Sequence, residues 1–305
     1  MSFQRTISSE VEVAGIGLHS AVPVKIRLLP AAANRGVVFR RTDLEGFEIP
    51  ALWKHIARVS YATSLMRKGV LISTTEHLLA ALYSTGVDNA VVEISSLELP
   101  ILDGSCAPFI RLLQQARPKR QRARRRYLRL RRKVQVVEGS KRIAIYPHDG
   151  FRVTSSIDFP HPMIGKQEIE LDLTPETFER EIAAARTFGF LEDIPQMKDM
   201  GLVRGGSLEN AVVFTRDALL NKEGLRFPDE CCRHKLLDLI GDLALIGHPL
   251  RAHVVAERAG HAMHTALVLK LVRDRSLWEM TTLDEPARAT VPAMPELAVE
   301  MRGRE

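Results

Sequence analysis

The stretch RPKRQRARRRYLRLRRK, residues 117–133, divides the chain into two halves of similar size. It contains 11 Lys or Arg residues and no acidic residue, and like charges at this density repel one another. We therefore expect its first part to be an exposed linker, whereas the alternation of apolar residues from Tyr127 indicates entry into a strand. This division predicts two domains, residues 1–116 and 134–285, with a basic linker at 117–133 and a C-terminal tail at 286–305.

The basic character of the chain is confined to this stretch. The net charge is +6, and once the 11 cationic residues are set aside the rest carries −5. A length of 305 residues suits two domains of ~100–150 residues, and 45% hydrophobic and 26% charged residues are typical of a globular protein. No apolar run approaches the ~18 residues that span a bilayer, and the first residues lack a secretory pattern, so we expect a cytoplasmic protein.

Three cysteines, Cys106, Cys231 and Cys232, constrain the metal chemistry of the chain. An odd number without a C-x-x-C spacing argues against a disulfide framework, and it excludes a zinc site built from four thiolates. A metal site would therefore use mainly His and carboxylate ligands.

Strands precede helices in both halves of the chain. Alternating apolar residues predict strands at 11–13, 22–28, 88–94, 134–137, 142–146, 151–157 and 252–256, and helical spacing predicts helices at 75–82, 175–185 and 230–246. Thr174 is the expected N-cap of the second helix, and Glu176 lies in its first turn. This order favours an α+β fold of two similar domains, each pairing helices with a β-sheet, over a doubly wound parallel sheet.

His234 and Asp238 are four residues apart in the predicted helix 230–246, so both side chains lie on one face. An imidazole nitrogen and a carboxylate oxygen could thus reach the same ion. The alternative is a His–Asp pair within core packing or an ion pair at the surface. For these two residues considered alone, that alternative is the more frequent arrangement.

Glu76 and His77 stand at the start of the predicted helix 75–82. A catalytic zinc site usually has three protein ligands and one open position for water. His77 would be the third ligand, and Glu76 would accept a proton from that water. The alternative is structural, because Ser73 and Glu76 have the spacing of a capping box at a helix N-terminus.

His261 follows the predicted strand 252–256 at a junction before a helix. A histidine there can act as an acid or stabilise an oxyanion if a carboxylate orients its other nitrogen. Asp242, four residues beyond Asp238, could supply that carboxylate. His264 competes for the same role, and spacing alone does not choose between the two; a capping or surface histidine is the other alternative.

These residues together provide the metal ligands, the base and the acid that metal-assisted hydrolysis needs, but they do not identify a substrate. Further segments run through nearly the whole chain: GIGLH at 15–19, GVVFRRTD at 36–43, STTEHLLAAL at 73–82, DN at 88–89, PILDGS at 100–105, ARTFGF at 185–190, GGSLENAVV at 205–213, GLRF at 224–227, RHKLLDLIGD at 233–242 and AGH at 259–261. In these segments the chain resembles the bacterial UDP-3-O-acyl-N-acetylglucosamine deacetylases of lipid A biosynthesis.

The resemblance implies an active site between the two domains, where one Zn²⁺ per chain is bound by His77, His234 and Asp238; Fe²⁺ is the alternative metal in the cell. It implies hydrolysis of the acetamido group of UDP-3-O-(hydroxyacyl)-N-acetylglucosamine, which releases acetate. The implied catalytic residues are the general base Glu76, the acid His261 with Asp242 behind it, and Thr187, whose hydroxyl meets the oxyanion.

The resemblance also implies the contacts of the UDP-linked acylated amino sugar. Lys235 is expected at the diphosphate or the sugar. Asp158 is expected to hydrogen-bond the uracil, and Phe159 is expected to stack on it. His19 and Phe188 are expected to line the sugar region.

An insert near residues 191–214 is expected, by the same resemblance, to enclose the acyl chain. Its small residues Gly206, Ser207 and Ala211 suit a narrow apolar passage, although a simple turn is the alternative for the glycine. Arg258 is a further expected substrate contact, and it stands where many family members have lysine, which changes the hydrogen-bond geometry but keeps the charge.

Three other interpretations concern the basic stretch or the identity of the substrate. Residues 117–133 could neutralise nucleic-acid phosphates, but the stretch has one aromatic residue and the rest of the chain is net acidic, so no nucleic-acid partner is expected. A weak contact with the anionic inner-membrane surface is a second use of the same charges. Another N-acyl sugar nucleotide is the alternative substrate.

Overall fold

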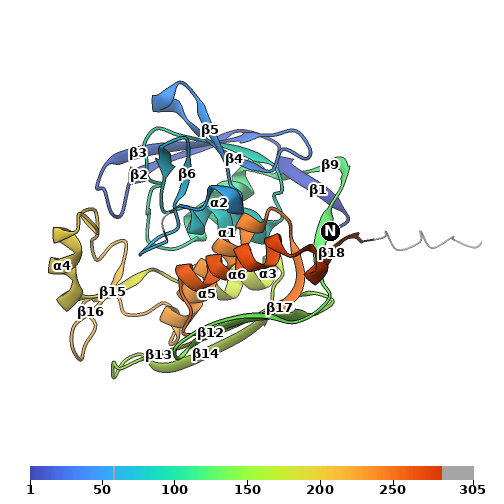
Figure 1. Cartoon of the computed structure of the whole chain (residues 1–305). Helices are drawn as coiled ribbons and strands as arrows, with labels where there is room; N and C mark the ends of the chain where they lie inside the picture. The colour runs from blue at the N-terminus through green and yellow to red at the C-terminus, as the bar shows by residue number, and fades with distance from the viewer. Residues whose placement is uncertain (58, 284–305) are drawn as a thin grey trace, which may run out of the picture.

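Helices from both halves of the chain lie together between two β-sheets (Figure 1). The computed structural model describes residues 1–57 and 59–283. Helix α1 (Glu76–Thr85) from the first half packs along α5 (Glu230–Leu243) from the second, and α2 (Ala107–Ala116) and α6 (His261–Arg273) flank this pair. The expectation of an α+β fold is confirmed.

The N-terminal half supplies a five-stranded sheet in which only β4 and β8 run parallel among its pairs. Its alternating residues place Val24, Ile26 and Leu28 in the core and the charged residues between them outside. In sheet order the strands are β2 (Val11–Ile16), β3 (Pro23–Pro30), β8 (Ala90–Ile94), β4 (Val37–Arg41) and β5 (Phe47–Pro50), with a separate hairpin of β6 (Leu65–Arg67) and β7 (Val70–Ile72).

The C-terminal half supplies a seven-stranded sheet centred on β17 (Leu250–Glu257), which pairs with β12, β13 and β10. The other strands are β10 (Arg126–Leu130), β11 (Val134–Glu138), β12 (Lys141–Pro147), β13 (Phe151–Phe159), β14 (Gly165–Asp172) and β18 (Trp278–Thr282). Beyond this sheet, β15 (Phe188–Phe190) pairs in parallel with β16 (Val212–Phe214), and α4 (Ile194–Asp199) lies in the connection between them.

The expected helix at 175–185 is the shorter α3 (Pro175–Glu181). Thr174 caps it as expected, because its hydroxyl accepts a hydrogen bond from the Thr177 backbone N–H. The expected helix at 230–246 is α5, followed by a 3₁₀ turn at Ala244–Ile246.

The first part of the basic stretch, expected to be an exposed linker, has exposed charged residues, but it is a strand rather than a connection without regular structure. Residues Pro118–Arg124 form β9, which pairs antiparallel with β1 (Phe3–Ile7). The Arg120 guanidinium lies 3.6 Å from the centroid of the Phe3 ring, and the charges of the strand project into solvent, so pairing and a cation–π contact outweigh the repulsion. The expected strand entry near Tyr127 is confirmed by β10.

The domain boundaries stay a prediction, and the expected tail at 286–305 lies outside the described residues. Across residues 1–57 and 59–283, no helix combines the length and the apolar character that crossing a membrane requires.

Candidate metal centre

Gly241 permits the helix crossing on which the site depends. A Cβ atom at this position in α5 would lie 2.1 Å from the backbone oxygen of Glu76 in α1, so a larger residue would push the helices apart. Glycine is unfavourable inside a helix by ~1 kcal/mol relative to alanine, and close packing is the physical reason for it here. The crossing places the first turn of α1 against the face of α5 that carries His234 and Asp238.

Three buried side chains converge at this crossing. The Nε2 atoms of His77 and His234 lie 3.7 Å and 3.4 Å from Asp238 Oδ1, and the three ligand atoms lie within 4.8 Å of one another. Ligands about 2.0–2.1 Å from a tetrahedral zinc ion are ~3.4 Å apart, so the spacing fits such an ion. The alternative of a surface ion pair is wrong, because His77, His234 and Asp238 are all buried.

The protonation of these groups also suits a cation. The Ala185 carbonyl can only accept a hydrogen bond, so its 3.1 Å contact with His234 Nδ1 places the proton on that nitrogen and leaves Nε2 as the electron-pair donor. Burial lowers the pKa of His234 to about 4. Burial opposes ionisation of Asp238, but the neighbouring His234, Lys235 and His261 outweigh it and hold its pKa well below the usual range.

Glu76 faces the same centre and does not cap its helix. Its Oε2 accepts a hydrogen bond of 3.0 Å from the Thr63 backbone N–H, and burial raises the pKa of its carboxyl group. The capping-box alternative is wrong, because Thr75 precedes the helix without a side-chain cap and the Ser73 hydroxyl accepts instead from the Ser64 hydroxyl. Glu76 is therefore free to act on a molecule in the site.

His261 and His264 share one carboxylate but lie differently. Both donate from Nδ1 to Asp242 Oδ2, at 2.7 Å and 2.9 Å. The Nε2 of His261 lies 3.8 Å from Asp238 Oδ2, and among the described residues His261, and not His264, lines the adjoining cavity. Burial lowers the pKa of His261, but the charges of Asp242 and Asp238 outweigh it and raise the pKa to about 9. This pKa favours the imidazolium form at neutral pH, in which both ring nitrogens carry a proton.

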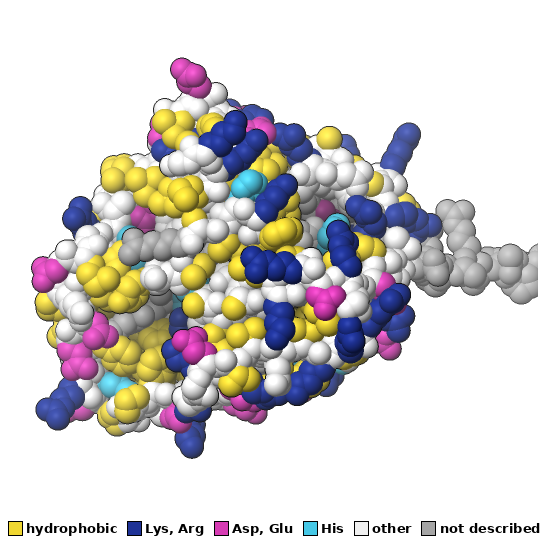
Figure 2. Space-filling model, in the orientation of Figure 1, with side chains coloured by type: hydrophobic (Ala, Val, Ile, Leu, Met, Phe, Trp, Pro, Cys, Tyr) yellow, Lys and Arg dark blue, Asp and Glu magenta, His cyan; other side chains and the backbone are white. Residues whose placement is uncertain are grey.

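A cavity of about 760 Å³ opens from this centre. One part of its lining is polar: Glu76, His77, His234, Lys235, Asp238 and His261. Another part is apolar and comes from the region of α4, β15 and β16: Leu191, Ile194, Met197, Val203, Leu208, Val213 and Leu220. Figure 2 shows hydrophobic side chains gathered around a hollow on the side of the molecule that carries these elements in Figure 1.

Most of the expected substrate-contact residues line this cavity. They are His19, Phe159, Thr187, Phe188, Lys235, Gly206, Ser207 and Ala211. The Phe188 ring joins the two parts, because its centroid lies 5.6 Å from that of Phe159 and 6.5 Å from that of His234, with the Lys235 ammonium 5.8 Å away.

Two expected contacts lie away from the lining. Asp158 is exposed beside Phe159, and Arg258 donates to the Ser140 backbone oxygen at 2.6 Å. The buried thiols of Cys231 and Cys232 are poor metal ligands, because burial raises the pKa of each to about 12.

The structure adds positioning residues that sequence reasoning missed. The Thr63 hydroxyl donates to Asp242 Oδ1 while its backbone N–H binds Glu76, so one loop residue fixes both carboxylates. The buried Glu98 carboxylate accepts hydrogen bonds from the backbone N–H groups of His19 and Ser20. Neither residue belongs to a periodic pattern or a ligand-like spacing, so the sequence held no signal for them.

Comparison with known proteins identifies the family. A family model described as UDP-3-O-acyl N-acetylglycosamine deacetylase matches residues 4–273. The UDP-3-O-acyl-N-acetylglucosamine deacetylase of Solibacter usitatus (strain Ellin6076) is 58% identical over 294 residues, which cover 96% of this chain and 99% of the relative. The enzyme of the same name from Myxococcus xanthus (strain DK1622) is 47% identical over 286 residues, 93% of this chain and 90% of the relative. The chain therefore belongs to the UDP-3-O-acyl N-acetylglycosamine deacetylase family.

Proposed function

We propose that this protein is a zinc-dependent deacetylase that hydrolyses the N-acetyl group of UDP-3-O-(hydroxyacyl)-N-acetylglucosamine in lipid A biosynthesis. The reaction releases acetate and leaves a free amine on the sugar. The observation that carries this proposal is a buried set of two imidazoles and one carboxylate, with a glutamate and a further histidine beside it, in a cavity of about 760 Å³ that has a polar and an apolar part. Family membership supplies the substrate.

The donor set fits a zinc ion in ligand type, spacing and protonation. His77, His234 and Asp238 would hold one ion per chain, with Fe²⁺ as the alternative in the cell. When bound, such an ion supplies Lewis-acid polarisation of the amide carbonyl and of a water molecule.

The remaining groups divide the proton transfers between them. Glu76 is the general base, since it lies in one cluster with Asp238 and His261 and burial raises the pKa of its carboxyl group toward the working pH. Protonated His261 would donate to the leaving amine, and Asp242 would stabilise its cationic form. The Thr187 hydroxyl, in the cavity wall, would donate to the oxyanion.

The substrate would lie along the cavity from the metal ligands to the apolar lining. Lys235 is 3.2 Å from Asp238, so its ammonium would sit beside the metal and meet the sugar or the diphosphate. We propose that Phe159 stacks on the uracil and that Asp158 hydrogen-bonds it, while His19 and Phe188 hold the sugar.

The acyl chain would enter the passage beside Gly206, Ser207 and Ala211, in the insert near 191–214. Arg258, which donates to the Ser140 carbonyl and is not among the described residues lining the cavity, is proposed as a further substrate contact.

Acetate release tests this function directly. We expect UDP-3-O-(hydroxyacyl)-N-acetylglucosamine to be turned over by the metal-loaded protein, and UDP-N-acetylglucosamine without the 3-O-acyl chain to be turned over far more slowly. Equal turnover of the two substrates would favour another N-acyl sugar nucleotide, and no acetate from either would reject the deacetylase function.

We propose a cytoplasmic location for the protein. We also propose that it has no nucleic-acid partner, because basic residues of the stretch 117–133 form ion pairs with acidic residues of the same chain. The buried Arg125 pairs with Asp88 at 2.8 Å, and Arg131 pairs with Glu279 at 2.8 Å. The weak contact with anionic lipid would then rest on exposed residues of β9 such as Arg122 and Arg124. Binding to vesicles containing anionic lipid that is unchanged when both are replaced by Ala would dismiss it.

A further inference from the structure

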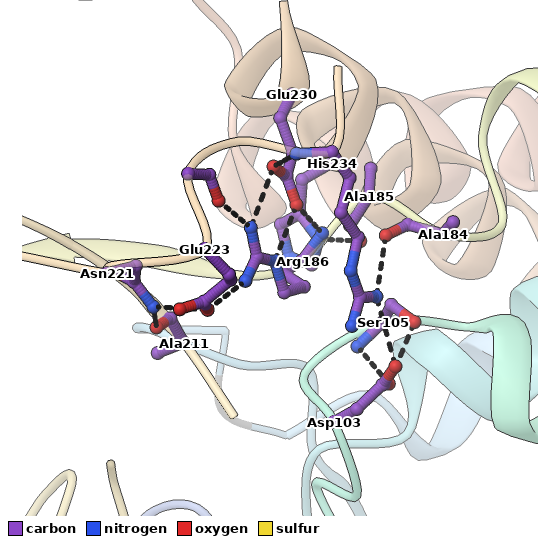
Figure 3. A network of polar contacts seen from close by, with 12 residues as sticks. Asp103, Ser105, Ala184, Ala185, Arg186, Ala211, Asn221, Glu223, Glu230 and His234 are labelled. Carbon is purple, nitrogen blue, oxygen red and sulfur yellow. Dashed lines mark hydrogen bonds and ion pairs between the residues drawn. The ribbon is translucent and has the colours of Figure 1, made fainter. Parts of the chain in front are cut away.

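A buried arginine that no step of the reaction uses lies beside the metal centre (Figure 3). The side chain of Arg186 is 2% exposed and that of Glu230 is 1% exposed. The Arg186 guanidinium donates from Nε to Glu230 Oε1 at 2.9 Å and from Nη2 to Glu230 Oε2 at 3.2 Å. It also donates to the Glu223 carboxylate at 2.8 Å and to the Gly224 carbonyl at 2.7 Å.

Stability alone is a weak reason for such a pair. The desolvation of two buried charges largely offsets their attraction, so apolar residues of the same volume often serve a fold equally well. A forked guanidinium with four directional hydrogen bonds does fix geometry closely, because each bond limits the orientation of the groups it joins.

The fork joins the start of the metal helix to the segment that orients a metal ligand. Glu230 is the first residue of α5, one turn before His234, and its Oε1 also accepts from the Arg186 backbone N–H at 2.9 Å. The residue before Arg186 is Ala185, whose carbonyl accepts from His234 Nδ1. The residue after it is Thr187, in the cavity wall.

A second arginine holds the same segment from the other side. Arg226 donates from Nη1 to the Ala184 carbonyl and to Asp103 Oδ2, both at 3.0 Å. Asp103 belongs to the N-terminal half, and its Oδ1 accepts from both the backbone N–H and the hydroxyl of Ser105. The Thr187 N–H donates to the Gly104 carbonyl at 2.8 Å, so residues 184–187 are fixed to both halves of the chain.

We propose that Arg186 and Arg226 are positioning residues that clamp residues 184–187, so that the Ala185 carbonyl sets the tautomer and orientation of His234 and Thr187 keeps its place in the cavity. Neither arginine is among the described residues that line the cavity. The clamp acts through one backbone carbonyl, and groups that orient a metal-binding histidine in this way typically contribute ~10–100-fold to metal affinity or activity. The proposal rests on the proposed metal site, and its test separates the two.

Arg186→Gln and Arg226→Gln remove the clamps, and Arg125→Gln is the matched control. Arg125 is also a buried arginine. It pairs with Asp88, whose side chain is 14% exposed, and contacts Tyr127 rather than the residues of the metal centre. Zinc affinity is measured by chelator competition, kcat and KM by acetate release, and the tautomer of His234 in the metal-free chain by ¹⁵N NMR.

We expect Arg186→Gln to weaken zinc binding ~10–100-fold, to lower kcat more than KM changes, and to populate the Nε2–H tautomer of His234. Arg226→Gln should act in the same direction but less, since its side chain is 35% exposed. Arg125→Gln should lower the melting temperature while zinc affinity and the tautomer stay as in the wild type.

The proposal would be overturned if Arg186→Gln and Arg226→Gln both kept the zinc affinity and the His234 tautomer of the wild type, even with lower melting temperatures. If Arg186→Gln does not fold, Arg186→Lys takes its place, because it keeps the charge and loses the fork; unchanged zinc affinity there and in Arg226→Gln would likewise overturn it. A wild-type chain that binds no zinc would instead reject the metal site itself.

Discussion

The two parts of the cavity are built in different ways. The metal-binding part comes from helices. Its carboxylates are buried and have protein partners, as with Glu76 on Thr63 and Asp242 on His261. The apolar part comes from short elements and loops between 188 and 220, where Leu191, Met200 and Leu208 are 45%, 50% and 43% exposed.

The difference between the two parts matches how much side-chain movement each function tolerates. Proton transfer and metal binding need groups held to a fraction of an ångström, so the polar part is fixed by hydrogen bonds and by close helix packing. An acyl chain makes only non-directional contacts, so exposed apolar side chains on loops suffice for it. Substitutions in the two parts should therefore act on different kinetic quantities.

The largest effect is expected from the loss of a metal ligand. Asp238→Ala removes the carboxylate that both histidines approach, so metal content and acetate release should fall to background, as after chelation of the wild type. Mass spectrometry of the native protein and the acetate assay measure these outcomes. A variant that keeps its metal and its rate would show that Asp238 is not a ligand.

A large effect on both stability and rate is expected where α1 crosses α5. Gly241→Val would insert a side chain against the Glu76 backbone, and such overpacking costs ~1–3 kcal/mol of unfolding free energy and displaces the base. Urea unfolding and kcat are the measurements. Gly150→Ala is the control, because a Cβ atom there meets nothing closer than 3.5 Å, and it should change the unfolding free energy by less than ~0.5 kcal/mol.

A moderate and selective effect is expected from the apolar part. Ala211→Leu narrows the cavity, so kcat/KM for the acylated substrate should fall ~10–200-fold, the usual range for a misfit in a hydrophobic pocket. Metal content and the slow turnover of UDP-N-acetylglucosamine should not change. Equal losses for both substrates would place Ala211 at the sugar rather than at the acyl chain.

The smallest effect is expected far from the cavity. Arg122→Ala and Arg124→Ala remove exposed charges of β9 and should leave kcat/KM within ~2-fold of the wild type, since exposed charges contribute ~0–1 kcal/mol. The acetate assay at low and moderate salt checks this. A salt-dependent loss would assign these arginines a part in attracting the anionic substrate.

Local periodicity predicted which residues share a face of one helix or strand. It did not predict contacts between segments that are distant in the chain. The pairing of His234 with Asp238 follows from helical spacing, but their meeting with His77 depends on the packing of α1 on α5, which no local pattern encodes. Spacing equally left His261 and His264 unresolved, because both reach Asp242 and only the cavity distinguishes them.

Charge density misled the prediction at residues 118–124 for the same reason. Repulsion along the stretch is a local property, whereas its pairing with β1 and the contact of Arg120 with Phe3 are not. Thr63 and Glu98 were missed because their roles come from hydrogen bonds to partners that lie elsewhere in the chain. The family resemblance assigned His77, His234 and Asp238 to one metal site, which residue spacing alone did not. It did not predict the clamp formed by Arg186 and Arg226.

Metal content and acetate release of Glu76→Gln, measured beside the wild type, show directly whether Glu76 is the base of a metal-dependent hydrolysis. The substitution keeps the size of the side chain and removes the base, so about one metal per chain should remain in both proteins while kcat falls ~10²–10⁴-fold. Wild-type turnover by Glu76→Gln, or full activity of the metal-free protein, would contradict a metal-dependent hydrolysis with Glu76 as its base.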